Sequence, residues 1–262
     1  MNVNPALELR TIRLRVRDLD RSAAFYSRLG FVTLAREAGS ATFATAADAP
    51  ASLTLVAAPQ AGAAPRDAAG LFHAALLLPS RAALGSWLRQ AAEAGVEFQG
   101  FSDHGVSEAI YFADPEGNGL EFYADRPQAA WPVHDGRIAM STLPLDLPGL
   151  LAAAGPGTPA GGRLAGARWG HLHLRVTGLE RSAAFYREHL GVVTTQADYP
   201  GAHFLAADGY HHHLGLNTWG KPRRPQPADA PGLLEAVFAR RSATAETTLH
   251  DPDGIAVRLV PL

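Results

Sequence analysis

The sequence contains no cysteine. This absence excludes disulfide bonds, thiolate metal sites and cysteine nucleophiles, so any metal must be bound by His, Asp or Glu side chains. An excess of charge of one sign is missing as well, because 23 Lys and Arg face 25 Asp and Glu, for a formal net charge of −2. This balance provides no electrostatic basis for binding nucleic acid or an anionic membrane surface.

Long hydrophobic runs are also missing. The most apolar stretch, residues 71–88, is interrupted by Pro79, Ser80 and Arg81, too early for a membrane span. The first five residues lack the basic region and the apolar core of a secretory signal. We therefore expect a cytoplasmic protein with no membrane and no nucleic acid among its partners. Its 262 residues, 47% of them hydrophobic, are sufficient for a sizeable core.

One six-residue segment, Arg-Ser-Ala-Ala-Phe-Tyr, occurs twice, at 21–26 and at 181–186. Each copy follows a segment with strand-like alternation, at 12–16 and at 172–176. The apolar spacing of each copy predicts a helix, and a Leu-Gly pair follows where a helix would be capped, ending in Gly30 and Gly191. This repetition indicates a duplicated unit.

Four modules of the type strand–helix–strand–strand–strand account for most of the chain. We place them at 9–57, 71–125, 168–218 and 232–262. The last one is shortened: Leu71 and Glu121 lie 50 residues apart, but the matching Leu233 and Arg258 lie only 25 apart, so we expect no helix there. Residues 126–167, rich in Pro, Gly and Ala, are predicted to link an N-terminal domain (1–125) to a C-terminal domain (168–262). A linker of this length would let modules pair out of chain order.

Modules of this kind, strung in fours and opened by a strand and an (Arg/Lys)-Ser-x-x-Phe-Tyr helix, resemble the vicinal oxygen chelate superfamily. That superfamily includes glyoxalase I, bleomycin-resistance proteins and type I extradiol dioxygenases. The resemblance covers nearly all of the chain except the linker. It implies an α+β fold of tandem modules that form cupped mixed sheets around a metal site. Since this fold hosts several chemistries, the function has to be inferred from the residues of the site.

The resemblance also indicates where a metal would be bound, on the first and last strands of two paired modules. The matching first-strand positions, in module order, are Thr11, His73, His171 and Glu235. The matching last-strand positions in modules one, two and four are Leu55 or a neighbour, Glu121 and Arg258. Pairing the third module with the fourth would put the permanent charge of Arg258 at the metal position. Only the pairing of modules two and three completes a triad, formed by His73, Glu121 and His171.

Two imidazoles and one carboxylate are the donor set of non-haem Fe(II) oxygenases. We therefore expect Fe²⁺ at this triad, with Mn²⁺, Ni²⁺ and Zn²⁺ as alternatives. His173 lies two residues after His171, on the same face of a strand, and is an alternative ligand.

Two further segments resemble extradiol dioxygenases in particular. Residues 111–121, Tyr-Phe-Ala-Asp-Pro-Glu-Gly-Asn-Gly-Leu-Glu, match the signature Tyr-Phe-x-Asp-Pro-x-Gly-Asn-x-x-Glu, which implies that Tyr111 and the upstream His104 contact substrate oxygens. Residues 202–213 resemble the segment Ala-His-Phe-Leu-x-x-Asn-Gly-x-His-His, which implies that His212 is the acid/base residue. If this segment were a strand, His211 and His213 would share one face and His212 the other, and either neighbour is an alternative for the acid/base role.

These assignments predict a metal-dependent extradiol dioxygenase that cleaves a small aromatic diol of the catechol type with O2. One alternative is a glyoxalase-like isomerase or lyase, which needs a second carboxylate ligand. Residues 214–217 on the matching strand contain none, although Glu108 or Glu235 could enter from elsewhere. The other alternative is a metal-free binding or resistance protein with a flat, aromatic-lined pocket. The identity and ring substituents of the substrate, the metal in vivo, the pairing of the modules and the formation of a homo-oligomer are left open.

Overall fold

The computed structural model of the chain describes residues 6–154 and 162–262. Module one contains β1 (Leu7–Val16), α1 (Leu19–Leu29), β2 (Val32–Arg36), β3 (Ser40–Ala44) and β4 (Leu53–Ala57). Module two contains β5 (Gly70–Leu77), α2 (Arg81–Glu93), β6 (Phe98–Asp103), β7 (Ser107–Ala113) and β8 (Gly119–Asp125). Module three contains β12 (Arg168–Arg175), α4 (Leu179–Leu190), β13 (Val193–Gln196), β14 (Ala202–Ala206) and β15 (Leu214–Asn217). Module four contains β16 (Gly232–Arg240), β17 (Thr247–His250) and β18 (Ala256–Pro261), and none of its residues 232–262 is helical, as predicted.

The segment between modules two and three contains short elements of its own, which its composition did not reveal. They are η1 (Gln128–Ala130), β9 (Val133–His134), β10 (Arg137–Ile138), β11 (Leu143–Pro144) and α3 (Leu147–Ala152). Strand β11 pairs with β6 and so extends a sheet, and α3 packs against α2. The segment therefore connects the modules and also contributes to the fold.

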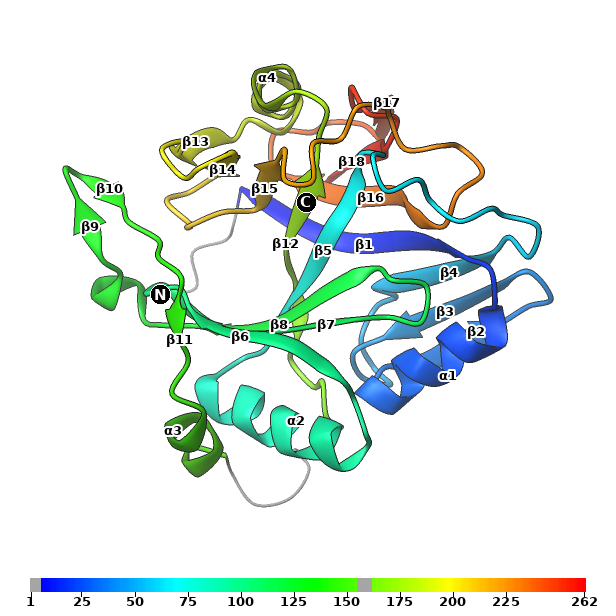
Figure 1. The fold of residues 1–262 in the computed structure, drawn as a ribbon, viewed down its shortest axis with the longest axis horizontal. Helices are drawn as coiled ribbons and strands as arrows, with labels where there is room; N and C mark the ends of the chain where they lie inside the picture. Colours follow the sequence, from blue (N-terminus) through cyan, green and yellow to red (C-terminus); the bar gives the residue numbers. More distant parts are fainter. Residues whose placement is uncertain (1–5, 155–161) are drawn as a thin grey trace.

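The modules pair out of chain order (Figure 1). One sheet has the strand order β17-β18-β16-β1-β4-β3-β2 and joins modules one and four. The other has the order β11-β6-β7-β8-β5-β12-β15-β14-β13 and joins modules two and three. Each joint is an antiparallel pair of first strands, β1 with β16 and β5 with β12. The expected α+β fold of tandem modules in curved mixed sheets is confirmed, whereas the division into two domains stays a prediction.

The duplicated six-residue segment lies in α1 and α4, and its last residue connects the two sheets. Tyr26 on α1 donates a hydrogen bond to Asp114 of module two, with an oxygen–oxygen distance of 3.1 Å. Tyr186 on α4 donates in the same way to Asp251 of module four, at 2.8 Å. Both hydroxyls are buried. A tyrosine therefore ties module one to module two and another ties module three to module four, although the strands of each pair belong to different sheets.

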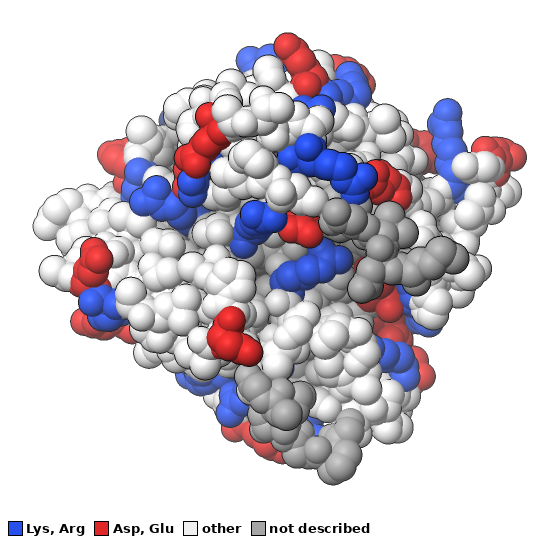
Figure 2. All heavy atoms as spheres, turned by 180° about the vertical axis from the view of Figure 1, so that it is seen from behind, with Lys and Arg blue, Asp and Glu red and all other residues white. Residues whose placement is uncertain are grey.

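The ends of these helices follow the sequence signals. Gly30 after α1 and Gly191 after α4 adopt positive φ angles of 113° and 70°, which side chains with a Cβ rarely adopt. Within the described residues no helix is long and apolar enough to cross a membrane. On the face shown in Figure 2, Lys and Arg side chains lie interspersed with Asp and Glu side chains.

Candidate metal centre and active-site cavity

Strand β5 is the centre of the candidate site because it pairs with β8 on one side and with β12 on the other. Ala75 on β5 is directly opposite both Glu121 on β8 and His171 on β12. Since residues in register point to the same face, the small Ala75 leaves the space above it to the two larger side chains. His73, two residues earlier on β5, points to that face as well. Strand pairing thus brings the three predicted ligands together.

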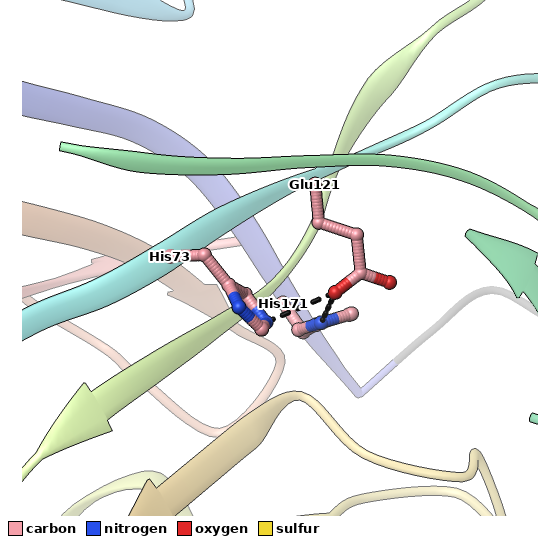
Figure 3. Close-up of side chains that lie close together, drawn as sticks. All are labelled: His73, Glu121 and His171. Atoms are coloured by element: carbon pink, nitrogen blue, oxygen red, sulfur yellow. Dashed lines mark hydrogen bonds and ion pairs between the residues drawn. The ribbon is translucent and has the colours of Figure 1, made fainter. Parts of the chain in front are cut away.

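The distances within this triad suit a shared metal ion (Figure 3). Oε2 of Glu121 lies 2.9 Å from Nε2 of His73 and 3.3 Å from Nε2 of His171. One candidate ligand atom from each residue lies within 4.8 Å of the other two. All three residues are buried, so the two imidazoles and the carboxylate meet away from solvent. Two imidazoles and one carboxylate are a donor set that fits a divalent transition metal.

The environment of the triad favours the protonation states that metal binding requires. Burial lowers the pKa of His171 to about 4, although the Glu121 carboxylate acts in the opposite direction. Burial alone would raise the pKa of Glu121, but His171 and His73 hold it well below its usual value. Near neutral pH, Glu121 is therefore ionised and His171 neutral, which is the state in which both bind metals.

A cavity of about 290 Å³ opens beside the triad. Its lining includes five of the six residues predicted for the site: His73, His104, Tyr111, Glu121 and His212. The sixth, His171, is 1% exposed and packs against the ring of His212, with 4.1 Å between the ring centroids. The apolar part of the lining consists mainly of aromatic side chains, from Phe72, Tyr199, Phe204 and Trp219.

Tyr111 and His104 form a hydrogen-bonded pair in this cavity. Tyr111 is directly opposite Glu121 in the β7–β8 hairpin, which explains the ten-residue spacing in the sequence. Nδ1 of His104 lies 2.6 Å from the carbonyl oxygen of Ser141, and Nε2 lies 2.6 Å from the Tyr111 hydroxyl. Because a carbonyl only accepts, Nδ1 carries the hydrogen in the neutral ring, and the Tyr111 hydroxyl donates to Nε2. Burial and the nearby Glu121 carboxylate raise the pKa of Tyr111 well above its usual value, so the hydroxyl keeps its proton.

The three consecutive histidines do not lie in a strand, so the expected alternation of their faces is wrong. Asp208 and Gly209 both adopt positive φ angles and form a turn, and β15 begins only at Leu214. In the irregular segment between them, the rings of His211 and His212 lie on the same side, with centroids 4.7 Å apart. His212 lines the cavity, whereas Nδ1 of His213 accepts a hydrogen bond from the backbone N–H of Ala207.

Comparison with known proteins places the chain in a family. A family model described as the Glyoxalase/Bleomycin resistance protein/Dioxygenase superfamily matches residues 8–122 and 168–248. The chain belongs to this superfamily. A relative from Bacillus subtilis (strain 168), named catechol-2,3-dioxygenase, is 40% identical over 231 residues, which cover 84% of this chain and 78% of the relative.

Two solved structures of the superfamily illustrate the fold. A putative dioxygenase from Bacillus subtilis subsp. subtilis str. 168 superposes with a TM-score of 0.64 at 11% identity, covering 96% of this chain and 84% of that one. Glyoxalase I from Zea mays superposes with a TM-score of 0.57 at 17% identity, covering 97% of this chain and 92% of the maize chain. At these identities the likeness concerns the fold alone.

Glyoxalase-like chemistry in this superfamily was expected to need a second carboxylate, and the two available candidates are engaged elsewhere. Glu108 pairs with Arg81 at 2.6 Å and with Arg126 at 3.4 Å. Glu235 lies in the other sheet, where Arg258 binds it at 3.1 Å. Neither belongs to the cluster of possible metal ligands found among the described residues.

His173, the alternative ligand, also lies at the cavity. It is directly opposite His73 in the pairing of β12 with β5, but it does not belong to the triad of candidate ligand atoms. Its ring packs on Gly215, where a Cβ atom would lie 2.7 Å from it. His173 therefore lines the cavity but is not part of the triad.

Sequence reasoning missed the contribution of the linker to the cavity. Met140, Ser141 and Thr142 line it, although the segment was expected only to connect modules. Asp125, which holds His211 at 2.9 Å, was missed as well. A signal for Asp125 was present, because it lies four residues after Glu121 and so on the same face of β8. No comparable signal existed for the linker residues, since they have no counterpart in another module.

Proposed function

We propose that this chain is an extradiol ring-cleaving dioxygenase that acts on a catechol-type diol with O2. The observation that carries the proposal is the meeting of His73, Glu121 and His171, from two different modules, at a cavity that also holds His212. The 40% identical relative named catechol-2,3-dioxygenase supports the same activity.

His73, Glu121 and His171 would hold the metal. We propose Fe²⁺, because two imidazoles and one carboxylate are the donor set of non-haem iron oxygenases, although Mn²⁺, Ni²⁺ and Zn²⁺ are compatible with the same residues. Bound there, Fe²⁺ would supply Lewis acidity and one-electron redox chemistry for the diol and O2.

The size and the walls of the cavity suit one aromatic ring. An apolar cavity of about 150 Å³ holds benzene, so about 290 Å³ leaves room for a catechol with a small substituent. Phe72 and Trp219 meet edge to face, with centroids 5.4 Å apart, and would contact the faces or edges of the ring. These walls would also keep water away from the reacting carbons.

His212 would move the proton that a diol loses on binding. Burial and the neighbouring His171 hold the pKa of His212 well below its usual value, so the ring is neutral and one of its nitrogens has a free lone pair. Tyr111 and His104 are hydrogen-bonded to each other and would orient the substrate oxygens. The resemblance to extradiol dioxygenases suggests this division of roles, and the positions of the three side chains at the cavity support it.

The proposal is tested by loading the protein anaerobically with Fe²⁺, adding catechol or alkylcatechols, and then admitting O2. We expect a yellow ring-fission product and the uptake of one O2 for each ring opened. His212→Gln should lower kcat by about 10²- to 10⁴-fold while metal content stays unchanged. The matched control, His134→Gln on the exposed hairpin of β9 and β10, should retain both activity and metal.

Two outcomes would overturn the proposal. A wild-type protein that binds no metal would support a metal-free binding protein instead. A metal-loaded protein that leaves catechols intact but isomerises the hemithioacetal of methylglyoxal and glutathione would support glyoxalase-like chemistry.

A further inference from the structure

Strand β8 contributes more to the site than its ligand Glu121. Residues 121, 123 and 125 alternate along the strand and so share one face. Asp125, the last of them, ends the strand with its side chain 24% exposed. Its Oδ1 lies 2.9 Å from Nε2 of His211, and its Oδ2 accepts a hydrogen bond from the Tyr210 hydroxyl at 3.0 Å. Both oxygens of this carboxylate are therefore occupied, which fixes its orientation.

The ring of His211 is fully buried and cannot turn freely. It lies next to the rings of Trp131 and Tyr210, with centroid distances of 5.2 Å and 4.0 Å. Its backbone carbonyl accepts a hydrogen bond from Thr195, at 2.8 Å. Asp125 on its Nε2 side completes this enclosure, so His211 presents Nδ1 in one direction only.

That direction is toward His212. The two Nδ1 atoms of His211 and His212 lie 2.7 Å apart. A carboxylate only accepts, so Nε2 of His211 carries its hydrogen, and Nδ1 of the neutral ring has none. For the short contact to be a hydrogen bond, Nδ1 of His212 has to carry the hydrogen and donate it. Nε2 of His212 then bears a lone pair.

We propose that Asp125 and His211 position His212 for proton transfer by fixing it as the Nδ1–H tautomer, with the lone pair of Nε2 available at the cavity. In Ser-His-Asp triads a carboxylate sets the tautomer of the catalytic histidine through a direct hydrogen bond. Here the ring of His211 would lie between the carboxylate and that histidine. Asp125 and His211 are positioning residues, since neither lines the cavity. The inference rests on the proposed function in one respect, that His212 accepts the proton of the substrate.

Nitrogen-15 NMR of histidine-labelled protein tests the tautomer without any activity measurement. The spectra are recorded on the metal-free protein and on the protein loaded with diamagnetic Zn²⁺, and His211→Gln and His212→Gln identify the two rings. We expect Nδ1 of His212 and Nε2 of His211 to be protonated and the other two nitrogens to be bare. A spectrum with hydrogen on Nε2 of His212, or with both nitrogens of His211 protonated, would overturn the proposal.

The variant Asp125→Asn tests whether the tautomer of His212 affects catalysis. An amide can donate as well as accept, so nothing forces a hydrogen onto Nε2 of His211, and the Nε2–H tautomer of His212 should become populated. We expect kcat to fall at least about tenfold, with KM changed less than about twofold and metal content unchanged. The matched control is Asp67→Asn, the same change at a half-exposed carboxylate that pairs with Arg224. It should alter neither the tautomer nor the rate.

The two arms separate this inference from the proposed function. If Asp125→Asn leaves both the spectrum and kcat as in the wild type, the positioning role is wrong although the dioxygenase stands. If the wild type is inactive on catechols but shows the expected tautomer, the geometry is right and only the reaction has to be revised.

Discussion

The two sheets present the same arrangement of positions with different residues in them. In the sheet of modules two and three, a row across β8, β5 and β12 reads Glu121, Ala75, His171. In the sheet of modules one and four, the matching row across β18, β16 and β1 reads Arg258, Val237, Thr11. Two residues further along, His73 faces His173 in one sheet, and Glu235 faces Arg13 in the other.

The row in the sheet of modules one and four explains why, among residues 6–154 and 162–262, a candidate metal centre is found in the other sheet alone. Glu235 lies 3.1 Å from Nε of Arg258 and 3.6 Å from Nη1 of Arg13, so its charge is already balanced by the protein. A guanidinium cannot give up its proton and cannot bind a cation. The duplication therefore supplies the same strand positions twice, and the residues at them, Arg258 and Thr11 in place of Glu121 and His171, remove two of the three candidate ligands from the second sheet.

The largest expected effect is on metal affinity, and it comes from comparing alanine substitutions at equivalent strand positions in the two sheets. His171→Ala should lower the affinity for Fe²⁺ by more than about 100-fold, since even the outer partners of metal ligands contribute 10- to 100-fold. Thr11→Ala removes only a hydroxyl that donates to the carbonyl of Ala51 and should leave metal affinity unchanged. Metal content after dialysis and a titration with Fe²⁺ measure both.

Because His171 is buried, its truncation could also disturb the fold. Glu121→Gln keeps the shape of its side chain and should lose metal affinity to a similar degree, while thermal unfolding shows that the variant is folded. If either ligand variant binds Fe²⁺ as tightly as the wild type does, the contrast between the sheets is not one of metal binding.

A substitution of Ala75, the central residue of the row Glu121, Ala75, His171, should have the next largest effect on metal affinity. Ala75→Val places the side chain of the other sheet between Glu121 and His171, and we expect metal affinity to fall by about 10- to 100-fold. Overpacking of this kind costs about 1–3 kcal/mol in folding free energy. The reverse change, Val237→Ala, should cost about 2 kcal/mol through the cavity it leaves and should not affect metal binding. Unchanged metal affinity in Ala75→Val would show that the small residue is not what admits the ligands.

Strand positions were the part of the site that sequence could predict. Repeated modules have the same register, so their alignment makes Thr11 equivalent to His171 and Glu121 equivalent to Arg258. The two sheets place these residues at equivalent positions. Tyr111 was identified together with Glu121 through the resemblance of residues 111–121 to the extradiol signature, and the β7–β8 hairpin explains their spacing. Counting ligands favoured the pairing of modules two and three, but only the strand contacts of β5 with β12 establish it.

The rest depended on irregular backbone and on contacts between distant segments. The turn at Asp208 and Gly209 turns His211 and His212 to the same side, and strand alternation cannot anticipate that. Ser141 reaches His104 from the linker, a segment without a repeated partner. Asp125 carried a signal in its spacing from Glu121, but its contact with His211 joins residues 86 positions apart, which only the fold reveals.

The smallest expected effect concerns a feature that the two halves share. Tyr26→Phe and Tyr186→Phe each remove a buried hydroxyl that donates to a buried aspartate, Asp114 or Asp251. Each change should lower the free energy of unfolding by about 1–2 kcal/mol at pH 8, and to a similar extent. Urea unfolding measures both, and a difference of more than about 1 kcal/mol between them would show that the two ties are not equivalent.

The pH dependence sharpens this comparison. Burial, reinforced by the aspartate, raises the pKa of Tyr26 and Tyr186 well above 10. A tyrosine whose pKa is raised in the folded state contributes its full stabilisation below pH 10. Above pH 10 the tyrosine ionises in the unfolded chain while it is still protonated in the folded one, so the free energy of unfolding falls as the pH rises. Between pH 9 and pH 11, each tyrosine should therefore lower the free energy of unfolding by up to about 1.4 kcal/mol. The double variant should lose less stability over this range than the wild type, and an equal loss in the two proteins would contradict the assignment.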